Sequence, residues 1–352
     1  MADFESRERE FATLERGDAR LNAMRDAIHE ADQCRDLHWQ FWFRYDYLEE
    51  SIFCGDRYYA LIIFPELLSL YDNNPTLRDD SGCTHSLLIC FKWIVEAAPE
   101  FPQIPKEQID AYFREFKKRL RQQECSLSIY YMKRSLFYMH VDPDIAAMCF
   151  YRFLEEPLDE ISDGKALYYD QQVLFYLSVG EEEKALKAAE PIFNGTYKSS
   201  SLPQATYHDF IRYYMTHGEH EKALHYAKLT VQRVDGDPYY HDVIGTLMTL
   251  YARYDRLRAI ELLSRNWQDF LDSKNPWLRM QFASGAAFLM DHLCLEPELM
   301  SELRLPVSMR KASPDEIRHS FHAVAKDLAA KFDARNGTDD YMQLYLSPFG
   351  KE

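Results

Sequence analysis

Residues 167–195 read LYYDQQVLFYLSVGEEEKALKAAEPIFNG, and this stretch returns in altered form on both sides of itself. At a spacing of 38 residues, two tyrosines and one alanine recur as Tyr131, Tyr169 and Tyr207; Tyr138, Tyr176 and Tyr214; and Ala147, Ala185 and Ala223. A fixed period of about 20 to 50 residues is typical of proteins whose units bury their apolar faces by stacking on one another. The sequence therefore predicts a stack of structural repeats.

Each repeat has the pattern of two antiparallel helices. In the quoted copy, residues 167–178 are apolar at helical spacing, and Gly180 with the acidic residues after it predicts a turn and a helix start. A second helix is expected over 185–193, where an Asn-Gly pair ends it, because both residues tolerate a left-handed backbone. The neighbouring copies predict helical pairs over 126–156 and 206–234.

This pattern of paired helices, with its tyrosines and alanine, resembles the tetratricopeptide repeat (TPR). The resemblance covers residues 126–267, where a fourth pair with Ala259 in register follows the clear copies. It implies an all-α, right-handed α-α superhelix, a TPR-like solenoid of helix-turn-helix repeats whose first helices line a concave groove. The groove positions that the resemblance implies in this chain are Lys133, Asp170, Gln171, His208, Asp209, Arg212 and Met248.

We expect one elongated domain over residues 1–352, because a solenoid grows by adding repeats and not by dividing into domains. Within it, N-terminal helices and degenerate repeats occupy 1–125, the clearest repeats 126–271, and C-terminal capping helices 272–352. One degenerate repeat would turn at Gly55-Asp56.

The charge and cysteine patterns argue against several classes of function. The formal net charge is −16, whereas a general nucleic-acid binder needs a basic face. The sequence contains neither an apolar run of membrane-spanning length nor a secretory signal. Seven scattered cysteines without a Cys-x-x-Cys pair suit a reducing compartment. We therefore expect a cytoplasmic protein that binds neither nucleic acid nor a membrane.

A basic segment is the local exception to the acidic composition. Residues 114–121 contain five arginines and lysines. A solvated helix face explains them, and a docking patch for an acidic partner is the alternative.

Catalytic signatures are absent from the sequence, including the phosphate loop, the dinucleotide fingerprint, the nucleophile elbow and the zinc-protease motif. Two histidine groups remain, namely His217, His220 and His225 at a repeat turn, and Asp315, His319 and His322 on one helix stripe. A polar turn explains the first group and a capped helix with a wet face the second, so we predict no metal and no cofactor.

The sequence thus predicts a protein- or peptide-binding helical-repeat module, a scaffold or sensor, and not an enzyme. Its protein or peptide ligand would lie in the concave groove, where apolar anchors give affinity and polar groups fix the register. An alternative hypothesis is a peptide-regulated signalling protein resembling the pheromone receptors and response-regulator phosphatases of Gram-positive bacteria, motivated by the length, the acidity and the helices expected over 3–53. A third hypothesis is a metal-dependent hydrolase built on the histidine groups.

Overall fold

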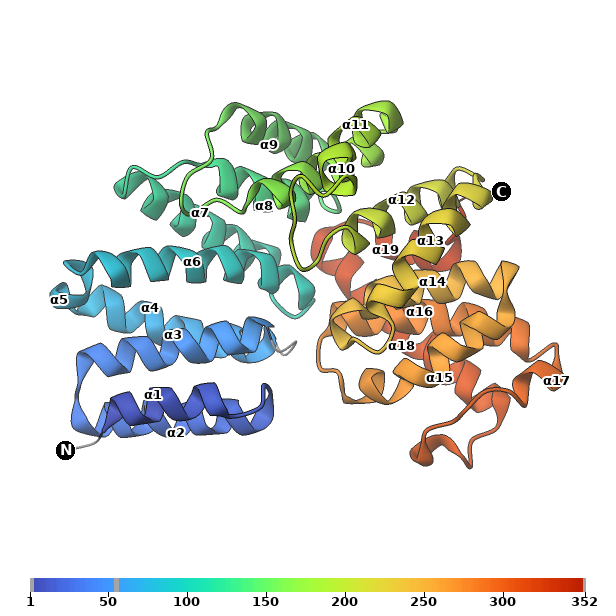
Figure 1. Cartoon of the computed structure of the whole chain (residues 1–352), viewed down its shortest axis with the longest axis horizontal. Coiled ribbons are helices and arrows are strands. Elements are labelled where there is room, and N and C mark those ends of the chain that lie inside the picture. Colours follow the sequence, from blue (N-terminus) through green and yellow to red (C-terminus); the bar gives the residue numbers. More distant parts are fainter. Residues whose placement is uncertain (1–2, 54–56, 351–352) are drawn as a thin grey trace. The chain divides into compact units, whose positions relative to one another are not determined.

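The chain is all-α, as the sequence predicts. The computed structural model describes residues 3–53 and 57–350, and within these ranges it contains nineteen α-helices and no strand (Figure 1). None of the helices in the described ranges combines the length and the apolar content needed to cross a membrane. The turn predicted at Gly55-Asp56 lies outside the described residues.

Contacts along the chain divide it into two compact units, Met1–Ser162 and Asp163–Glu352. The division falls inside the region of the clearest repeats, and not at the segment boundaries expected after residues 125 and 271. The single elongated domain stays a prediction, and each unit is described by itself.

The first unit is a group of helices around an aromatic core. Its consecutive helices pack on one another, and α3, α4 and α6 contact each other in all three combinations. Phe41, Phe64 and Phe91 are fully buried among them. The helices are α1 (Phe4–Thr13), α2 (Asp18–Cys34), α3 (Leu37–Phe53), α4 (Arg57–Asn73), α5 (Pro75–Arg78), α6 (Ser81–Ala97), α7 (Lys106–Gln122), α8 (Ser128–Tyr138) and α9 (Pro143–Glu155), with the 3-10 turn η1 (Ala98–Glu100).

The second unit is built from helical pairs. Packed pairs are α10 with α11, α12 with α13, and α14 with α15, while α10, α12, α14 and α16 contact one another in succession. The helices are α10 (Lys165–Ser178), α11 (Glu182–Phe193), α12 (Gln204–Thr216), α13 (His220–Val234), α14 (His241–Tyr254), α15 (Arg256–Asp272), α16 (Pro276–Leu293), α17 (Pro297–Met300), α18 (Pro314–Asn336) and α19 (Asp340–Leu346), with the 3-10 turns η2 (Pro238–Tyr240) and η3 (Val307–Met309). The pairs α10–α11 and α12–α13 lie close to the helices that the sequence predicts over 167–193 and 206–234.

The turns within successive pairs have the same geometry. Gly180 and Gly218 adopt φ values of 76° and 73°, a left-handed conformation that glycine adopts without strain. The amide of the following residue donates to the carbonyl oxygen of the repeated tyrosine in both turns, from Glu181 to Tyr176 and from Glu219 to Tyr214. The repeated sequence signature therefore encodes a repeated helix-to-helix turn.

The repeated alanines lie at helix contacts in the second unit. Ala223 is fully buried on α13, in the pair that α13 forms with α12. We expect Ala223→Leu to lower the free energy of unfolding by about 2 kcal/mol, because the larger side chain must push the helices apart. Urea unfolding followed by circular dichroism measures the change. Lys228→Leu, at an exposed position of the same helix, is the control and should stay within about 0.5 kcal/mol of wild type. Wild-type stability of Ala223→Leu would contradict a tight contact there.

The helices α14 and α16 approach each other closely where they cross at two glycines. A Cβ atom built on Gly285 would lie 2.0 Å from the carbonyl oxygen of Gly245, and one built on Gly245 would lie 2.2 Å from that of Gln281. Real Cβ atoms do not come so close to a backbone oxygen, so the two helices touch backbone to backbone. Glycine at both positions therefore sets the distance between α14 and α16.

Candidate functional site

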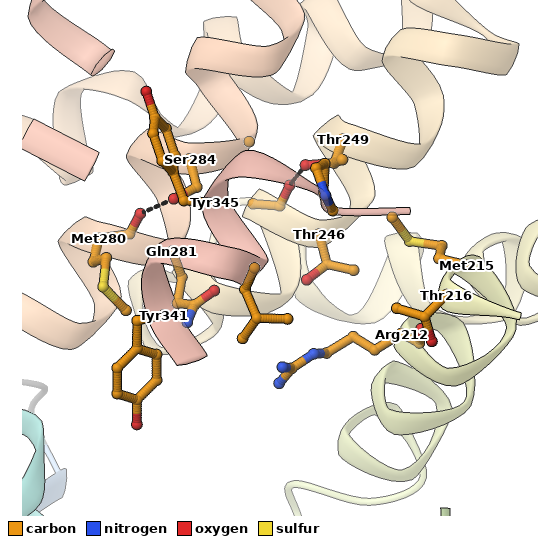
Figure 2. Close-up of a pocket in the computed structure, with 14 residues that line it drawn as sticks. Arg212, Met215, Thr216, Thr246, Thr249, Met280, Gln281, Ser284, Tyr341 and Tyr345 are labelled. Atoms are coloured by element: carbon orange, nitrogen blue, oxygen red, sulfur yellow. Dashed lines mark hydrogen bonds between the residues drawn. The ribbon is translucent and has the colours of Figure 1, made fainter. Parts of the chain in front are cut away.

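A small pocket lies between α12, α14, α16 and α19 of the second unit (Figure 2). Gly245 and Gly285 form part of its lining, because the glycine crossing leaves no side chains to fill the space beside it. The pocket is partly open, and its cavity volume is about 70 Å³. Polar side chains that line the pocket are Arg212, Thr246, Thr249, Gln281 and Ser284.

Arg212 supplies the positive charge of this pocket. Its side chain extends from α12 toward the part of the pocket lined by Gln281 and Tyr341 (Figure 2). The guanidinium makes neither a hydrogen bond nor an ion pair with the residues that the structure describes. A planar guanidinium presents five donors and binds a carboxylate through two parallel hydrogen bonds. The pocket therefore offers an unsatisfied site for an anionic group.

The hydroxyl groups around Arg212 are already committed as donors. Thr249 donates to the carbonyl oxygen of Gly245 at 3.0 Å, and Ser284 donates to that of Met280 at 2.8 Å (Figure 2). Their remaining lone pairs can only accept hydrogen bonds. The free donors that the pocket presents are the guanidinium of Arg212 and the side-chain amide of Gln281, which also has no hydrogen bond among the described residues.

Two carboxyl groups, on α10 and α12, interact electrostatically with one another, and the one on α12 also interacts with Arg212. Asp209 lies one helical turn before Arg212 on α12. Burial holds the pKa of Asp209 well above its ordinary value, and the negative charges of Asp170 and Asp242 raise it further. The positive charge of Arg212 acts in the opposite direction and lowers this pKa. Burial also raises the pKa of Asp170 to about 6, although its carboxylate accepts a hydrogen bond from Thr206 Oγ1 at 2.5 Å. Burial thus shifts Asp209 toward its protonated form, in which it would leave the charge of Arg212 for an external anion, whereas Asp170, with a pKa of about 6, is mostly ionised near pH 7.

His208 joins two helices and does not face the pocket as a free group. The ring is 7% exposed, and its Nε2 atom lies 2.8 Å from Thr246 Oγ1 of α14. Burial, reinforced by the charge of Arg212, lowers the pKa of His208 to about 3. The imidazole is therefore neutral near pH 7, and its hydrogen bond fixes the orientation of Thr246.

The remaining predicted groove residues are buried and offer little surface to a ligand. Met248 is fully buried in the core of the second unit, and Gln171 is 3% exposed with an amide nitrogen that has no partner among the described residues. Lys133, in the first unit, is 7% exposed and forms an ion pair of 2.6 Å with Glu96. Neighbouring helices cover these positions, and of the seven predicted groove residues Arg212 lines the pocket.

The structure adds pocket residues that the sequence analysis does not include, among them Thr246, Gln281 and Ser284. One sequence signal points toward them. Gly245 and Gly285 stand inside predicted helices, where an isolated glycine is unfavourable unless close packing requires it. Two such glycines 40 residues apart therefore mark a close helix contact and the hollow beside it.

The histidine groups of the sequence analysis take part in protein contacts. His322 lies 2.6 Å from the Tyr345 hydroxyl through Nδ1 and 3.0 Å from Asp291 through Nε2. His319 instead contacts the backbone oxygen of Asp315 at 2.6 Å. The described residues contain no group of three histidine, cysteine or acidic side chains placed to hold a metal ion.

The basic segment 114–121 lies on α7 of the first unit and is partly neutralised there. Arg119 pairs with Asp72 at 2.8 Å and with Glu115 at 2.9 Å, and Lys118 pairs with Glu115 at 3.3 Å. Lys117 lies 4.8 Å from the ring centre of Tyr130. At least three of the five basic side chains thus have partners within their own unit.

Comparison of the chain with protein-family models, with curated proteins and with solved structures gives no match.

Proposed function

We propose that the chain is a protein- or peptide-binding module whose helical pairs form a TPR-like, right-handed α-α superhelix, and that the face of α12, α14 and α16 is its binding surface. The observation that supports this most is the guanidinium of Arg212, which lies without a partner among the described residues where these three helices meet. A half-buried charge costs free energy unless something compensates it, and a bound anion does so.

A peptide that carries a carboxylate is the ligand that fits this chemistry best. The cavity volume of about 70 Å³ has room for such a group beside Arg212. Met215 and Met280 line the same pocket, and methionine adapts its shape to different apolar partners. The ligand is thus expected to place an acidic group on Arg212 and apolar side chains beside it.

Selection from a random peptide library, followed by calorimetric titration of a selected peptide, tests this proposal. Peptides selected on the wild-type chain should be enriched in acidic residues, and Arg212→Ala should weaken binding of the best one about tenfold or more, which is about 1.4 kcal/mol. The melting temperature should change little, because Arg212 has no ion pair to lose within the described residues.

Two further variants sharpen the result. Arg212→Lys keeps the charge but loses the planar pair of donors, so it should recover only part of the affinity. Arg233→Ala, at an exposed position on α13, removes one positive charge elsewhere in the unit and should bind as the wild type does. Equal affinity of Arg212→Ala and the wild type would refute the proposed site.

A further inference from the structure

The segment Asp340–Gly350, which consists of α19 and the residues after it, lies across the proposed binding surface. Gly337 ends α18 in a left-handed conformation with φ of 74°, and the chain then reverses. The carboxylate of Asp333 accepts hydrogen bonds from the amides of Tyr341 at 3.0 Å and Met342 at 2.8 Å. This attachment holds the start of α19 beside α18 and directs the segment over the pocket.

The side chains by which the segment meets the pocket follow a helical ligand pattern. Tyr341, Leu344 and Tyr345 of α19 line the pocket at positions i, i+3 and i+4, and Pro348 lines it after the helix has ended. Tyr341 and Tyr345 are labelled beside Arg212 and Thr246 in Figure 2. An amphipathic helix bound in a groove uses this spacing for its anchors. The intervening residue Leu346 is 64% exposed. The segment therefore occupies the surface in the way that a bound peptide helix would.

Contacts beyond the pocket extend this docking over further helices of the unit. The Phe349 ring lies 4.4 Å from the guanidinium carbon of Arg253 on α14 and 5.7 Å from the Phe288 ring on α16. The Tyr345 hydroxyl meets His322 of α18 at 2.6 Å. At Gly350 the backbone passes so close to α12 that a Cβ there would lie 2.9 Å from the carbonyl oxygen of Thr216.

This docking has the features of a replaceable contact. The helix α19 is seven residues long, well below the length at which an isolated helix is stable in water. Tyr341 is buried, but every residue from 342 to 350 is at least partly exposed. The segment places an apolar side chain, Leu344, in the pocket, and within the described residues it provides no ion pair for Arg212. A partner helix with the same apolar anchors and an added carboxylate would therefore make one interaction that the segment lacks.

We infer that the segment Asp340–Gly350 is an intramolecular occupant of the binding surface, and that an amphipathic partner helix with aromatic anchors and an acidic residue for Arg212 binds by displacing it. This inference rests on the proposed function. It adds that binding by the intact chain is weakened by self-occupancy and strengthened by any change that releases the segment.

The test uses a fluorescent synthetic peptide with the sequence of residues 338–350. All protein variants in the test are full-length chains. Anisotropy titration should show at least tenfold tighter binding to the double variant Tyr345→Ala and Phe349→Ala than to the wild type, because the variant has lost the anchors that hold its own segment. Leu346→Ala changes an exposed residue of the same segment and should behave as the wild type does. If the double variant keeps wild-type helicity but binds the peptide no more tightly, the inference is wrong.

A second measurement decides the question if the double variant does not fold. In the wild-type chain, excess unlabelled peptide should speed hydrogen exchange of the amides of residues 343–350, because the displaced segment loses its protection. Unchanged exchange at a peptide concentration that saturates the anisotropy signal would overturn the inference.

The outcomes separate this inference from the proposed function. If library peptides bind through Arg212 while the 338–350 peptide binds neither chain, self-occupancy is wrong and peptide binding stands. If the 338–350 peptide binds the released chain but no ligand depends on Arg212, the docking surface stands and the proposed role of Arg212 is wrong.

Discussion

Gly285→Ala should lower the free energy of unfolding by about 3 kcal/mol, at the upper end of the range for an added methyl group in a packed core. The reason is that the new Cβ would lie 2.0 Å from the Gly245 carbonyl oxygen, which belongs to the backbone of a helix and not to a flexible side chain. The gain of up to about 1 kcal/mol from replacing a helical glycine by alanine cannot offset the separation of two helices.

Urea unfolding followed by circular dichroism measures this effect, and a second glycine provides the control. Gly164 has nothing within 4 Å of its built Cβ and has an ordinary φ of −62°, so Gly164→Ala should change the stability by less than about 0.5 kcal/mol. A Gly285→Ala chain as stable as the wild type would show that α14 and α16 do not touch through their backbones in solution.

Acidification from about pH 7.5 to about pH 5 should cost roughly 4 kcal/mol of stability through His208 and His241 together, and His241→Phe should abolish about half of that loss. Burial alone lowers the pKa of His241 to about 4, and its two ring nitrogens have no hydrogen-bond partner in the described chain. The unfolded chain takes up a proton near pH 6.5, whereas the folded chain does not until the pH falls much further. Stability is therefore lost as the pH falls below about 6.5.

The measurement must compare variants, because carboxyl groups act in the opposite direction. The pKa of Asp170 is raised to about 6, so as the pH falls the folded chain binds this proton at a higher pH than the unfolded chain does. Protonation of Asp170 therefore adds stability as the pH falls through about 6. Free energies of unfolding at the two pH values, measured for the wild type and for His241→Phe, isolate the histidine. Equal pH dependence in both chains would show that His241 is protonated as easily when folded as when unfolded.

The helices of this protein could be predicted from the sequence because their signals are local. Apolar spacing and the turn glycines predict a helix over 167–178, close to α10 at Lys165–Ser178, and a helical pair over 206–234, close to α12 and α13 at Gln204–Thr216 and His220–Val234. The start of α11 is less accurate: the second helix of the quoted copy is expected over 185–193, but the structure begins it at Glu182, since the acidic residues form its first turn.

The composition of the candidate site depends on packing, which local signals do not report. Met248 and Arg212 both occupy first-helix positions that the TPR resemblance assigns to a groove, yet neighbouring helices bury Met248 and leave Arg212 lining a pocket. The docking of residues 340–350 joins parts of the chain that are far apart in sequence. A helical pattern in that segment predicts a helix but not the surface it meets.

The glycine crossing also determines which walls of the pocket can move. Side chains between two helices can change rotamers and absorb a shift, but backbone against backbone has no such freedom. The wall of the pocket that α14 and α16 form is therefore rigid. The helices α12 and α19 instead contribute side chains such as Arg212 and Leu344, which can change conformation. Ligands of different size must therefore be accommodated by movement of α12 and α19. The mechanical compliance of the site is confined to that side.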